Sequence, residues 1–191
     1  MGIFHRLRTD ESLMLCYQAG DPSAFNVLYG RHKDALYGFL LRSCPSQAAA
    51  EDLAQEAWTA LIKHAASYKP EAKFKTYLYT IARRKLVDFL RRPVNREHDE
   101  DETQLEDSAA LTPDKQVEVS RLLAHIQLLP RAQREAFLLK EEGFSLQEIA
   151  AITREETETI KSRIRYARSK LRDAMTDKLQ PCSDGSREPQ P

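Results

Sequence analysis

Thirteen residues near the C-terminal end of the chain, 160–172, combine an apolar stripe with a local excess of positive charge, and this combination restricts the fold more than any other feature. Ile160, Ile164, Ala167 and Leu171 recur at the i, i+4, i+7, i+11 spacing of one helix face. The segment holds six cations and no acid, namely Lys161, Arg163, Arg165, Arg168, Lys170 and Arg172. The pattern predicts a helix that packs one face on a core and presents cations beside it, as a protein that binds a polyanion does.

A second helix is predicted directly before this one. Ser145 and Glu148 have the spacing of a capping box, in which the serine hydroxyl accepts from the amide three residues on and the glutamate reaches back. The helix should begin at Leu146 and end at about Ile152, followed by a turn of three or four residues. Two helices joined in this way, the second one basic, form a helix-turn-helix that places its second helix in the major groove of DNA. An ordinary helical hairpin with a solvated basic side fits the same residues, so this segment favours DNA binding without deciding it.

The composition indicates an all-α protein. At 191 residues the chain is long enough for one or two small domains, and with only six glycines and 30% charged residues it suits helices better than a sheet. No apolar run approaches the roughly 20 residues that span a bilayer, and the first ten residues are too polar for a secretory signal. We therefore expect a cytoplasmic protein with no membrane insertion.

Charge is segregated along a chain whose formal net charge is zero. Residues 69–92 hold eight cations against two acids, and residues 95–118 hold nine acids against two cations. Breaks in the helical periodicity agree with this division. The third helix, for example, is expected to run from about Ala48 to Tyr68 and to end before Pro70. The sequence predicts an N-terminal helical domain (1–94), a flexible acidic linker (95–113), a C-terminal helix-turn-helix domain (114–176) and a disordered tail (177–191).

Catalytic and metal-binding patterns are absent from the sequence. It lacks the phosphate-binding glycine loops, H-E-x-x-H and G-x-S-x-G, and its five histidines are isolated. Its three cysteines lie far apart and form no C-x-x-C pair, and we expect Cys16 and Cys44 to be small buried apolar groups. We therefore predict no catalytic residues, no metal and no cofactor, and the chain is not expected to be an enzyme.

The segment 74–92 mixes aromatic and basic side chains. Phe74, Tyr77 and Tyr79 lie among cations, and stacking of bases on aromatic rings together with phosphate pairing is how proteins hold unpaired strands. The same residues fit a core helix whose apolar side chains pack inward while arginine and lysine stay in water. A helix has two faces, so both interpretations can hold.

In these segments the sequence resembles the bacterial sigma factors of the extracytoplasmic-function type, over residues of about 10–92 and 113–173. The motifs that carry the resemblance are Gly20-Asp21 with Ala24-Phe25 and Leu28-Tyr29; residues 51–56; residues 74–78 with 81–83 and Asp88; Leu129-Pro130 with Arg134-Glu135; and residues 148–150 with 159–163 and Ala167-Arg168. No single motif is specific, but five in register make a chance resemblance very unusual.

The resemblance implies a role for each segment. The helix with Asp52, Gln55 and Glu56 would dock on a coiled coil of core RNA polymerase. The segment 74–92 would recognise and melt the minus-ten promoter element with Lys75, Tyr77, Arg83, Arg84 and Lys85, flipping a base into a pocket. The helix-turn-helix would read the minus-thirty-five element as duplex DNA, with candidate contacts at Thr157, Thr159, Lys161, Ser162, Arg163, Arg165 and Arg168. An anti-sigma protein that covers the polymerase-binding surfaces is the remaining expected partner, besides core RNA polymerase and promoter DNA.

Four residues depart from the family pattern and bear on these roles. Tyr77 stands where the family often has Trp, and Arg84 where it often has Asn, which alters the melting pocket. Arg154 and Glu155 stand where the turn usually has Gly and a small apolar residue, and a non-glycine residue in a left-handed turn is strained.

Two other functions fit parts of the sequence. A dimeric helix-turn-helix regulator that acts without a sigma role would need the second domain but not the aromatic and basic segment of the first. An RNA-binding protein would use residues 74–92 without polymerase.

Overall fold

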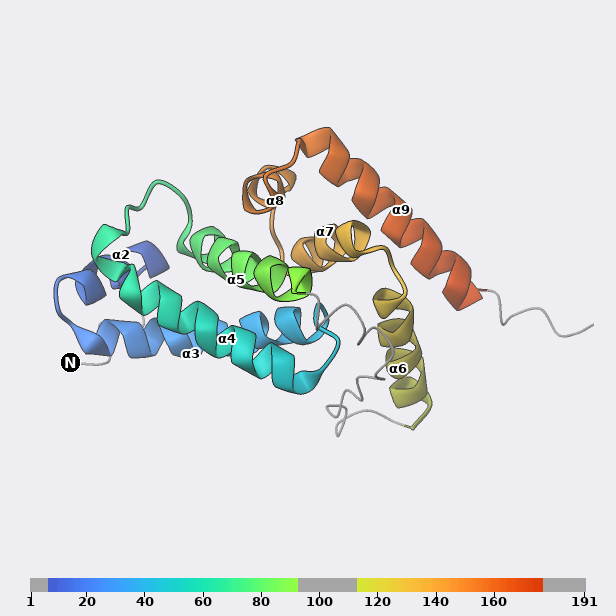
Figure 1. Cartoon of the computed structure of the whole chain (residues 1–191), viewed down its shortest axis with the longest axis horizontal. Coiled ribbons are helices and arrows are strands. Elements are labelled where there is room, and N and C mark those ends of the chain that lie inside the picture. Colours follow the sequence, from blue (N-terminus) through green and yellow to red (C-terminus); the bar gives the residue numbers. More distant parts are fainter. Residues whose placement is uncertain (1–6, 93–112, 177–191) are drawn as a thin grey trace, which may run out of the picture.

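A computed structural model describes residues 7–92 and 113–176, and every regular element in these two stretches is helical (Figure 1). The first stretch contains α2 (Asp10–Gln18), α3 (Pro22–Leu41), α4 (Gln47–Lys63), the short 3-10 helix η1 (Ala65–Ser67) and α5 (Phe74–Arg91). The second contains α6 (Pro113–Gln127), α7 (Arg131–Glu141), α8 (Leu146–Thr153) and α9 (Thr157–Thr176). Within the described residues the prediction of an all-α fold is confirmed.

Local sequence signals explain where the helices of the first stretch begin and end. The side chains of Thr9, Asp21 and Ser46 accept hydrogen bonds from amides in the first turns of α2, α3 and α4. Gly20 follows α2 with a φ of 99°, a backbone conformation that glycine adopts without strain, and so allows the chain to turn into α3. A core of mostly apolar side chains, including Leu36, fills the space between α2, α3, α4 and α5.

The second stretch contains the predicted helix-turn-helix. The capping box at Ser145 and Glu148 is present in full, and α8 begins at Leu146 as expected. Gly143, with a φ of 88°, ends the preceding α7. In α9 the stripe of Ile160, Ile164, Ala167 and Leu171 is buried, and α9 packs on α7, α8 and α6.

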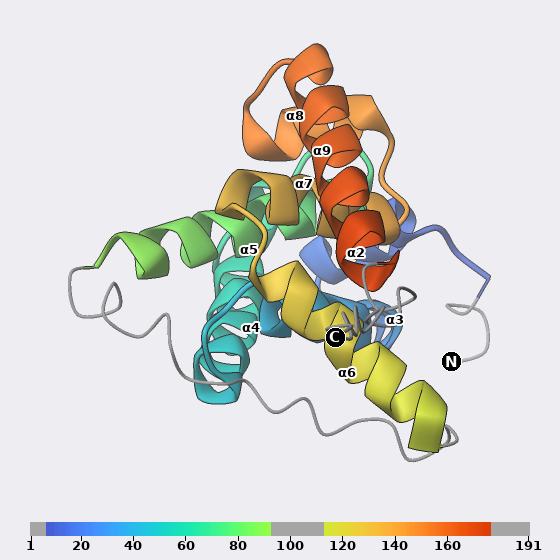
Figure 2. The same cartoon turned by 90° about the vertical axis from the view of Figure 1, so that its right-hand side faces the viewer.

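The two stretches are in contact with each other. The helix α8 packs on α5, and it lies on the same side of α5 in both views (Figures 1 and 2). Phe144, in the connection before α8, is buried with its ring 4.9 Å from that of Tyr79 in α5. The nucleic-acid candidates on α5 therefore lie beside the second group of helices.

Some sequence expectations about the elements differ from the structure or lie beyond it. The third helix was expected to reach Tyr68, but α4 ends at Lys63 and a 3-10 turn follows. The side chain of Gln18 donates to the carbonyls of Ala65, Ala66 and Tyr68, so these acceptors serve α2 rather than a longer α4. Most of the predicted acidic linker and the whole predicted tail lie outside the described residues. No helix in the described parts has the length and apolar character needed to cross a bilayer.

Candidate nucleic-acid interface

The exposed side of α9 carries the cations that the sequence placed there. Lys161, Arg165 and Arg168 are exposed, whereas Thr157, Thr159, Ser162 and Arg163 are half-buried, near the turn or beside the packed face. These differences in exposure follow from the helical period, because the residues lie on either side of the apolar stripe of α9, which packs on α7 and α8. The arrangement leaves a basic, solvent-facing surface on a helix held rigidly by its other face.

Ion pairs on α9 are mostly weak and solvent-exposed. Lys161 lies 3.4 Å from Glu158, and Arg168 lies 3.5 Å from Glu141. Exposed pairs of this kind contribute about 0–1 kcal/mol, so a phosphate can replace the acid at little cost. Arg163 differs, because its guanidinium donates to Glu155 in the turn at 3.1 Å and is the less exposed partner. Arg163 thus braces the turn as well as lying near the predicted groove face.

The turn of the helix-turn-helix contains a left-handed residue that is not glycine. Arg154 has a φ of 58° and a ψ of 43°, and its amide donates to the carbonyl of Ala150. A side chain in this conformation costs roughly 1 kcal/mol relative to glycine. Arg154, at the position where the family usually has glycine, therefore strains the backbone of the turn. The helices α8 and α9 still form on either side of it.

The aromatic residues of α5 are mostly buried, which corrects one expectation. Of the three rings singled out in the sequence, Phe74 and Tyr79 are fully buried and Tyr77 is partly exposed. The reason is the helical period, which places positions 74, 78, 82 and 86 on the face that packs inward. Two of the three rings proposed to stack on bases therefore stabilise the protein core. The alternative interpretation, a core helix with an outer basic side, holds for most of this segment.

The proposed melting cations of α5 fall into two groups by their partners. Arg84 is exposed, and Lys85 forms a 3.1 Å ion pair with Glu56 of α4. Lys75 and Arg83 are instead less exposed and contact acids of the second stretch. Of the proposed melting residues, Arg84 is therefore the most open to a nucleic acid in this conformation, and Tyr77 and Lys85 are partly exposed.

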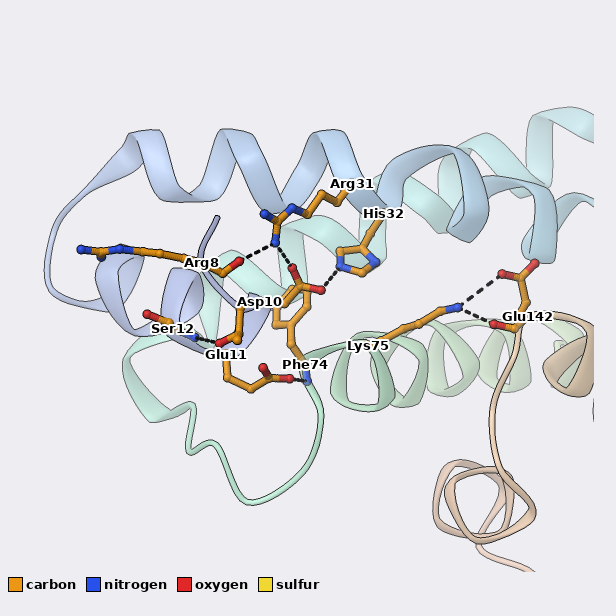
Figure 3. A network of polar contacts seen from close by, with 10 residues as sticks. Arg8, Asp10, Glu11, Ser12, Arg31, His32, Phe74, Lys75 and Glu142 are labelled. Atoms are coloured by element: carbon orange, nitrogen blue, oxygen red, sulfur yellow. Dashed lines mark hydrogen bonds and ion pairs between the residues drawn. The ribbon is translucent and has the colours of Figure 1, made fainter. Parts of the chain in front are cut away.

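Glu142, at the end of α7, is the centre of the contact between the two stretches. Its carboxylate lies 3.0 Å from the Arg42 guanidinium and 3.8 Å from the Lys75 ammonium, and it accepts from the Tyr79 hydroxyl at 3.0 Å. Lys75 also donates to the Glu142 backbone carbonyl (Figure 3). Burial, followed by the nearby Glu142 charge, raises the pKa of Tyr79 well above its usual range. One carboxylate thus holds three side chains of the first stretch.

Two further ion pairs reinforce this contact. The Arg83 guanidinium donates to both carboxylate oxygens of Glu135 on α7, at 2.7 and 3.3 Å, and the Glu135 side chain is only 11% exposed. Lys73 pairs with Glu148 of α8 at 3.0 Å. Bidentate, partly buried pairs of arginine with carboxylate are among the stronger ones. In this conformation two predicted DNA-binding cations are already occupied.

The predicted polymerase-binding residues lie on the outer side of α4. Asp52, Gln55 and Glu56 are exposed, and the opposite face of the helix is buried through Leu53 and other apolar residues. Asp52 and Gln55 have no contact with the second stretch among those found in the described residues. This acidic face is therefore open while the basic face of α5 is partly covered.

Sequence reasoning missed Glu142 and Arg42 altogether, and identified Glu135 only within a family motif. One signal was available for Glu142. It follows the last turn of α7, where the helix dipole disfavours an acid, so a nearby cation could have been expected. The identity of that cation depends on the packing of α8 on α5, which no sequence pattern reveals.

Comparison with known families agrees with this geometry. Residues 28–96 match the model of sigma-70 region 2, and residues 120–171 match that of sigma-70 region 4. The RNA polymerase sigma factor CarQ of Myxococcus xanthus is 34% identical over 139 residues, covering 71% of this chain and 80% of CarQ. The ECF RNA polymerase sigma-E factor of Haemophilus influenzae is 32% identical over 189 residues, covering 91% of this chain and 96% of that protein.

Two solved structures share the fold. CnrH in complex with the cytosolic domain of CnrY has a TM-score of 0.68 at 23% identity, covering 90% of this chain and 99% of that one. The sigma factor RpoE in complex with the anti-sigma factor NepR from Bartonella quintana has a TM-score of 0.66 at 26% identity, covering 80% of this chain and 96% of that one.

Proposed function

This chain belongs to the extracytoplasmic-function sigma factors, which direct RNA polymerase to specific promoters, and from that premise we propose which surfaces perform each step. In the proposal α9 reads the minus-thirty-five element, α5 recognises and melts the minus-ten element, and α4 docks on core polymerase. The N-terminal domain spans residues 1–94 and the helix-turn-helix domain spans 114–176, with 95–113 linking them. The observation that carries the proposal is the pair of amphipathic basic helices, one in each matched region.

The exposed cations of α9 support its proposed role in duplex reading. The first turns of a recognition helix face base edges, and here they carry Thr157, Thr159, Lys161 and Ser162, with Arg165 one turn on. Arginine and lysine donate to guanine in the major groove and to phosphates. Arg168 lies further along the helix and is assigned to the phosphate backbone, as Arg163 is to bracing the turn.

The proposed melting role of α5 requires the two domains to separate. Lys75 and Arg83 pair with Glu142 and Glu135 in the described conformation, and a carboxylate on these cations excludes a phosphate. We assign Arg84, Lys85 and Tyr77 to the first encounter with the minus-ten strand, and Lys75 and Arg83 to contacts made after the second domain has moved. Separation exchanges these ion pairs for phosphate contacts of similar kind, so its electrostatic cost is modest.

Docking on polymerase is assigned to the open acidic face of α4. Asp52, Gln55 and Glu56 are exposed on one side of a helix fixed in the core, as a docking helix requires. Because this face is accessible while the α5 cations are occupied, polymerase is proposed to bind before the minus-ten element does. We place the protein in the cytoplasm, where core polymerase meets the promoter.

An anti-sigma protein is the proposed regulator. The similar RpoE was solved with an anti-sigma factor and CnrH with the cytosolic domain of CnrY. By analogy, a partner that binds across both domains would hold α5 covered, and the contacts of Glu142 and Glu135 supply a closed arrangement for it to stabilise.

In vitro transcription with purified core polymerase tests the whole proposal. The chain should programme initiation at discrete starts, which mapping of transcripts after overproduction identifies. If the chain binds duplex DNA alone but never directs specific initiation, it acts as a helix-turn-helix regulator and the proposal fails. Tight binding of single-stranded RNA without polymerase would instead support the RNA-binding alternative.

A further inference from the structure

The start of α5 has no helix cap of its own. Lys73 occupies the N-cap position and its side chain makes no capping hydrogen bond. A lysine there also places positive charge at the positive end of the helix dipole. The first amides of α5 are in the turn that carries Lys75 and Tyr77, two of the residues assigned to the minus-ten element. The local sequence therefore leaves this turn poorly anchored.

Glu11 of α2 supplies the missing cap from 63 residues away. Its carboxylate accepts a hydrogen bond from the backbone amide of Phe74, the first residue of α5, at 2.8 Å (Figure 3). Carboxylates at helix N-termini are favoured both by the hydrogen bond to the charged group and by the helix dipole. The Phe74 side chain is fully buried, so the amide and the ring are fixed together.

The helix α2 is itself held firmly enough to act as an anchor. Asp10 accepts from the Arg31 guanidinium at 2.6 Å and lies 2.7 Å from the His32 ring nitrogen, both on α3 (Figure 3). The hydrogen bond with His32 is the main cause that holds the pKa of Asp10 below its usual value. At the other end of α2, Gln18 donates to three carbonyls between α4 and α5. The His32 ring also lies 5.4 Å from that of Phe74.

We propose that Glu11 is a positioning residue for promoter melting, which holds the first turn of α5 in the orientation that presents Lys75 and Tyr77 to the minus-ten strand. The proposal rests on the assigned role of α5. Glu11 lies outside residues 28–96, the stretch that matches sigma-70 region 2, so the melting helix depends on a residue beyond that stretch. Glu11 does not touch DNA in this scheme and acts through the backbone of Phe74.

The test compares Glu11→Ala and Glu11→Gln in holoenzyme reconstituted with core polymerase, on a promoter found by start mapping. Opening is measured by permanganate reactivity of thymines in the minus-ten region. We expect Glu11→Ala to lower opening by about fivefold, the factor that corresponds to loss of one helix cap. Glu11→Gln should lose less, because the amide oxygen still accepts. Glu71→Ala, an exposed acid in the connection before α5, is the matched control and should open the promoter normally.

A rescue variant separates positioning from general stability. Lys73→Ser provides a capping hydroxyl at the N-cap of α5, but it also removes the ion pair with Glu148, so Lys73→Ala in the same Glu11→Ala background is its control. The serine should restore opening to within about twofold of wild type, because it replaces most of the cap contribution, whereas the alanine should not. Core binding and affinity for minus-thirty-five duplex should not change in any variant. The inference would be overturned by any one of three results. Glu11→Ala could open the promoter normally, it could lose core binding as much as opening, or the serine could fail to restore opening. If wild-type holoenzyme itself opens no promoter, the assigned role of α5 fails first.

Discussion

The helices α5 and α9 have the same pattern in sequence, yet the structure treats their cations differently. Both bury an apolar stripe and carry arginine and lysine beside it. On α9 the cations at positions 161, 165 and 168 are exposed, whereas on α5 Lys75 and Arg83 are held by acids of the second stretch. An amphipathic basic helix thus indicates capacity to bind a polyanion, and the partner it contacts in the folded chain decides when that capacity is available.

The largest effect should follow from changing the polymerase-docking face, because docking is proposed to bring both helices to the promoter. We propose that the acids of α4 meet a basic surface of polymerase, so Asp52→Lys would place like charges opposite each other. Like charges across an interface cost several kcal/mol, so affinity for core polymerase should fall by roughly 30-fold or more. Affinity is measured by titration of labelled protein with core enzyme. Asp34→Lys, at an exposed acid on α3, is the control. Unchanged core binding by Asp52→Lys would remove this residue from the interface and leave α4 without its proposed role.

The next effect contrasts the two helices directly. Arg165→Ala should weaken affinity for duplex carrying the minus-thirty-five element by roughly 1 to 3 kcal/mol if the side chain reads a base edge. Arg83→Ala on α5 should leave that affinity unchanged, because its guanidinium is bound to Glu135. Fluorescence anisotropy with the full chain measures both. Equal losses would show that the two surfaces are not separated as described, and no loss with Arg165→Ala would reject this face of α9.

Releasing the covered cations should strengthen binding through α5. Glu142→Gln keeps the shape and hydrogen-bonding oxygen of the side chain but removes the charge that faces Arg42 and Lys75. We expect affinity for single-stranded minus-ten DNA to rise by about fivefold, equivalent to the roughly 1 kcal/mol that a partly buried pair contributes. Affinity for minus-thirty-five duplex should not change.

Glu118→Gln, on the exposed side of α6, is the matched control for that gain. If both variants raise single-strand affinity equally, the gain reflects net charge alone and the contact at Glu142 does not cover the α5 surface. If neither does, the α5 cations are already accessible in solution, and the contrast with α9 disappears.

The smallest effect concerns stability of the helix-turn-helix. Arg154→Gly should relieve the left-handed strain, worth roughly 1 kcal/mol, while added freedom of the unfolded chain offsets part of that gain. Arg154→Ala removes the same charge but keeps the strain, so it isolates the backbone effect. Thermal unfolding of the full-length protein should show a higher midpoint for the glycine variant than for alanine. A midpoint no higher than that of alanine would mean that the turn relaxes without glycine.

The sequence predicted most of the local structure because the signals are short-range. The capping box at Ser145 and Glu148 and the buried stripe of α9 are confirmed to the residue, since each depends on neighbours within about four positions. The end of α4 was predicted wrongly because Gln18, far away in sequence, takes carbonyls of the following turn. Phe74 and Tyr79 were placed on the nucleic-acid side because composition marks a segment as aromatic and basic without assigning each ring to a face.

For the candidate site as well, features set by nearby residues could be predicted, and contacts between distant segments could not. Residues on α9 and α4 could be placed from helical period and family motifs, and the structure leaves the charged groups of Asp52, Glu56, Lys161, Arg165 and Arg168 exposed. The covering of Lys75 and Arg83 and the cap from Glu11 could not, because each joins segments separated by 50 residues or more. Lys73 offered half of the signal for Glu11, because a poor N-cap leaves the first amides of the helix in need of an acceptor from elsewhere.

By itself the sequence determined that the chain is helical, where its helices begin, which faces they bury and that two of them are basic, because periodicity and capping act within a few residues. Only the tertiary structure decided which basic helix is open and which is covered, and which distant acid caps the start of α5. Contacts of this kind depend on how the helical groups pack on each other. In the sequence, Glu142 and Glu11 look like any other glutamate. The group that each carboxylate binds, Arg42 and Lys75 for Glu142 and the Phe74 amide for Glu11, is set by the distances between them in the folded chain.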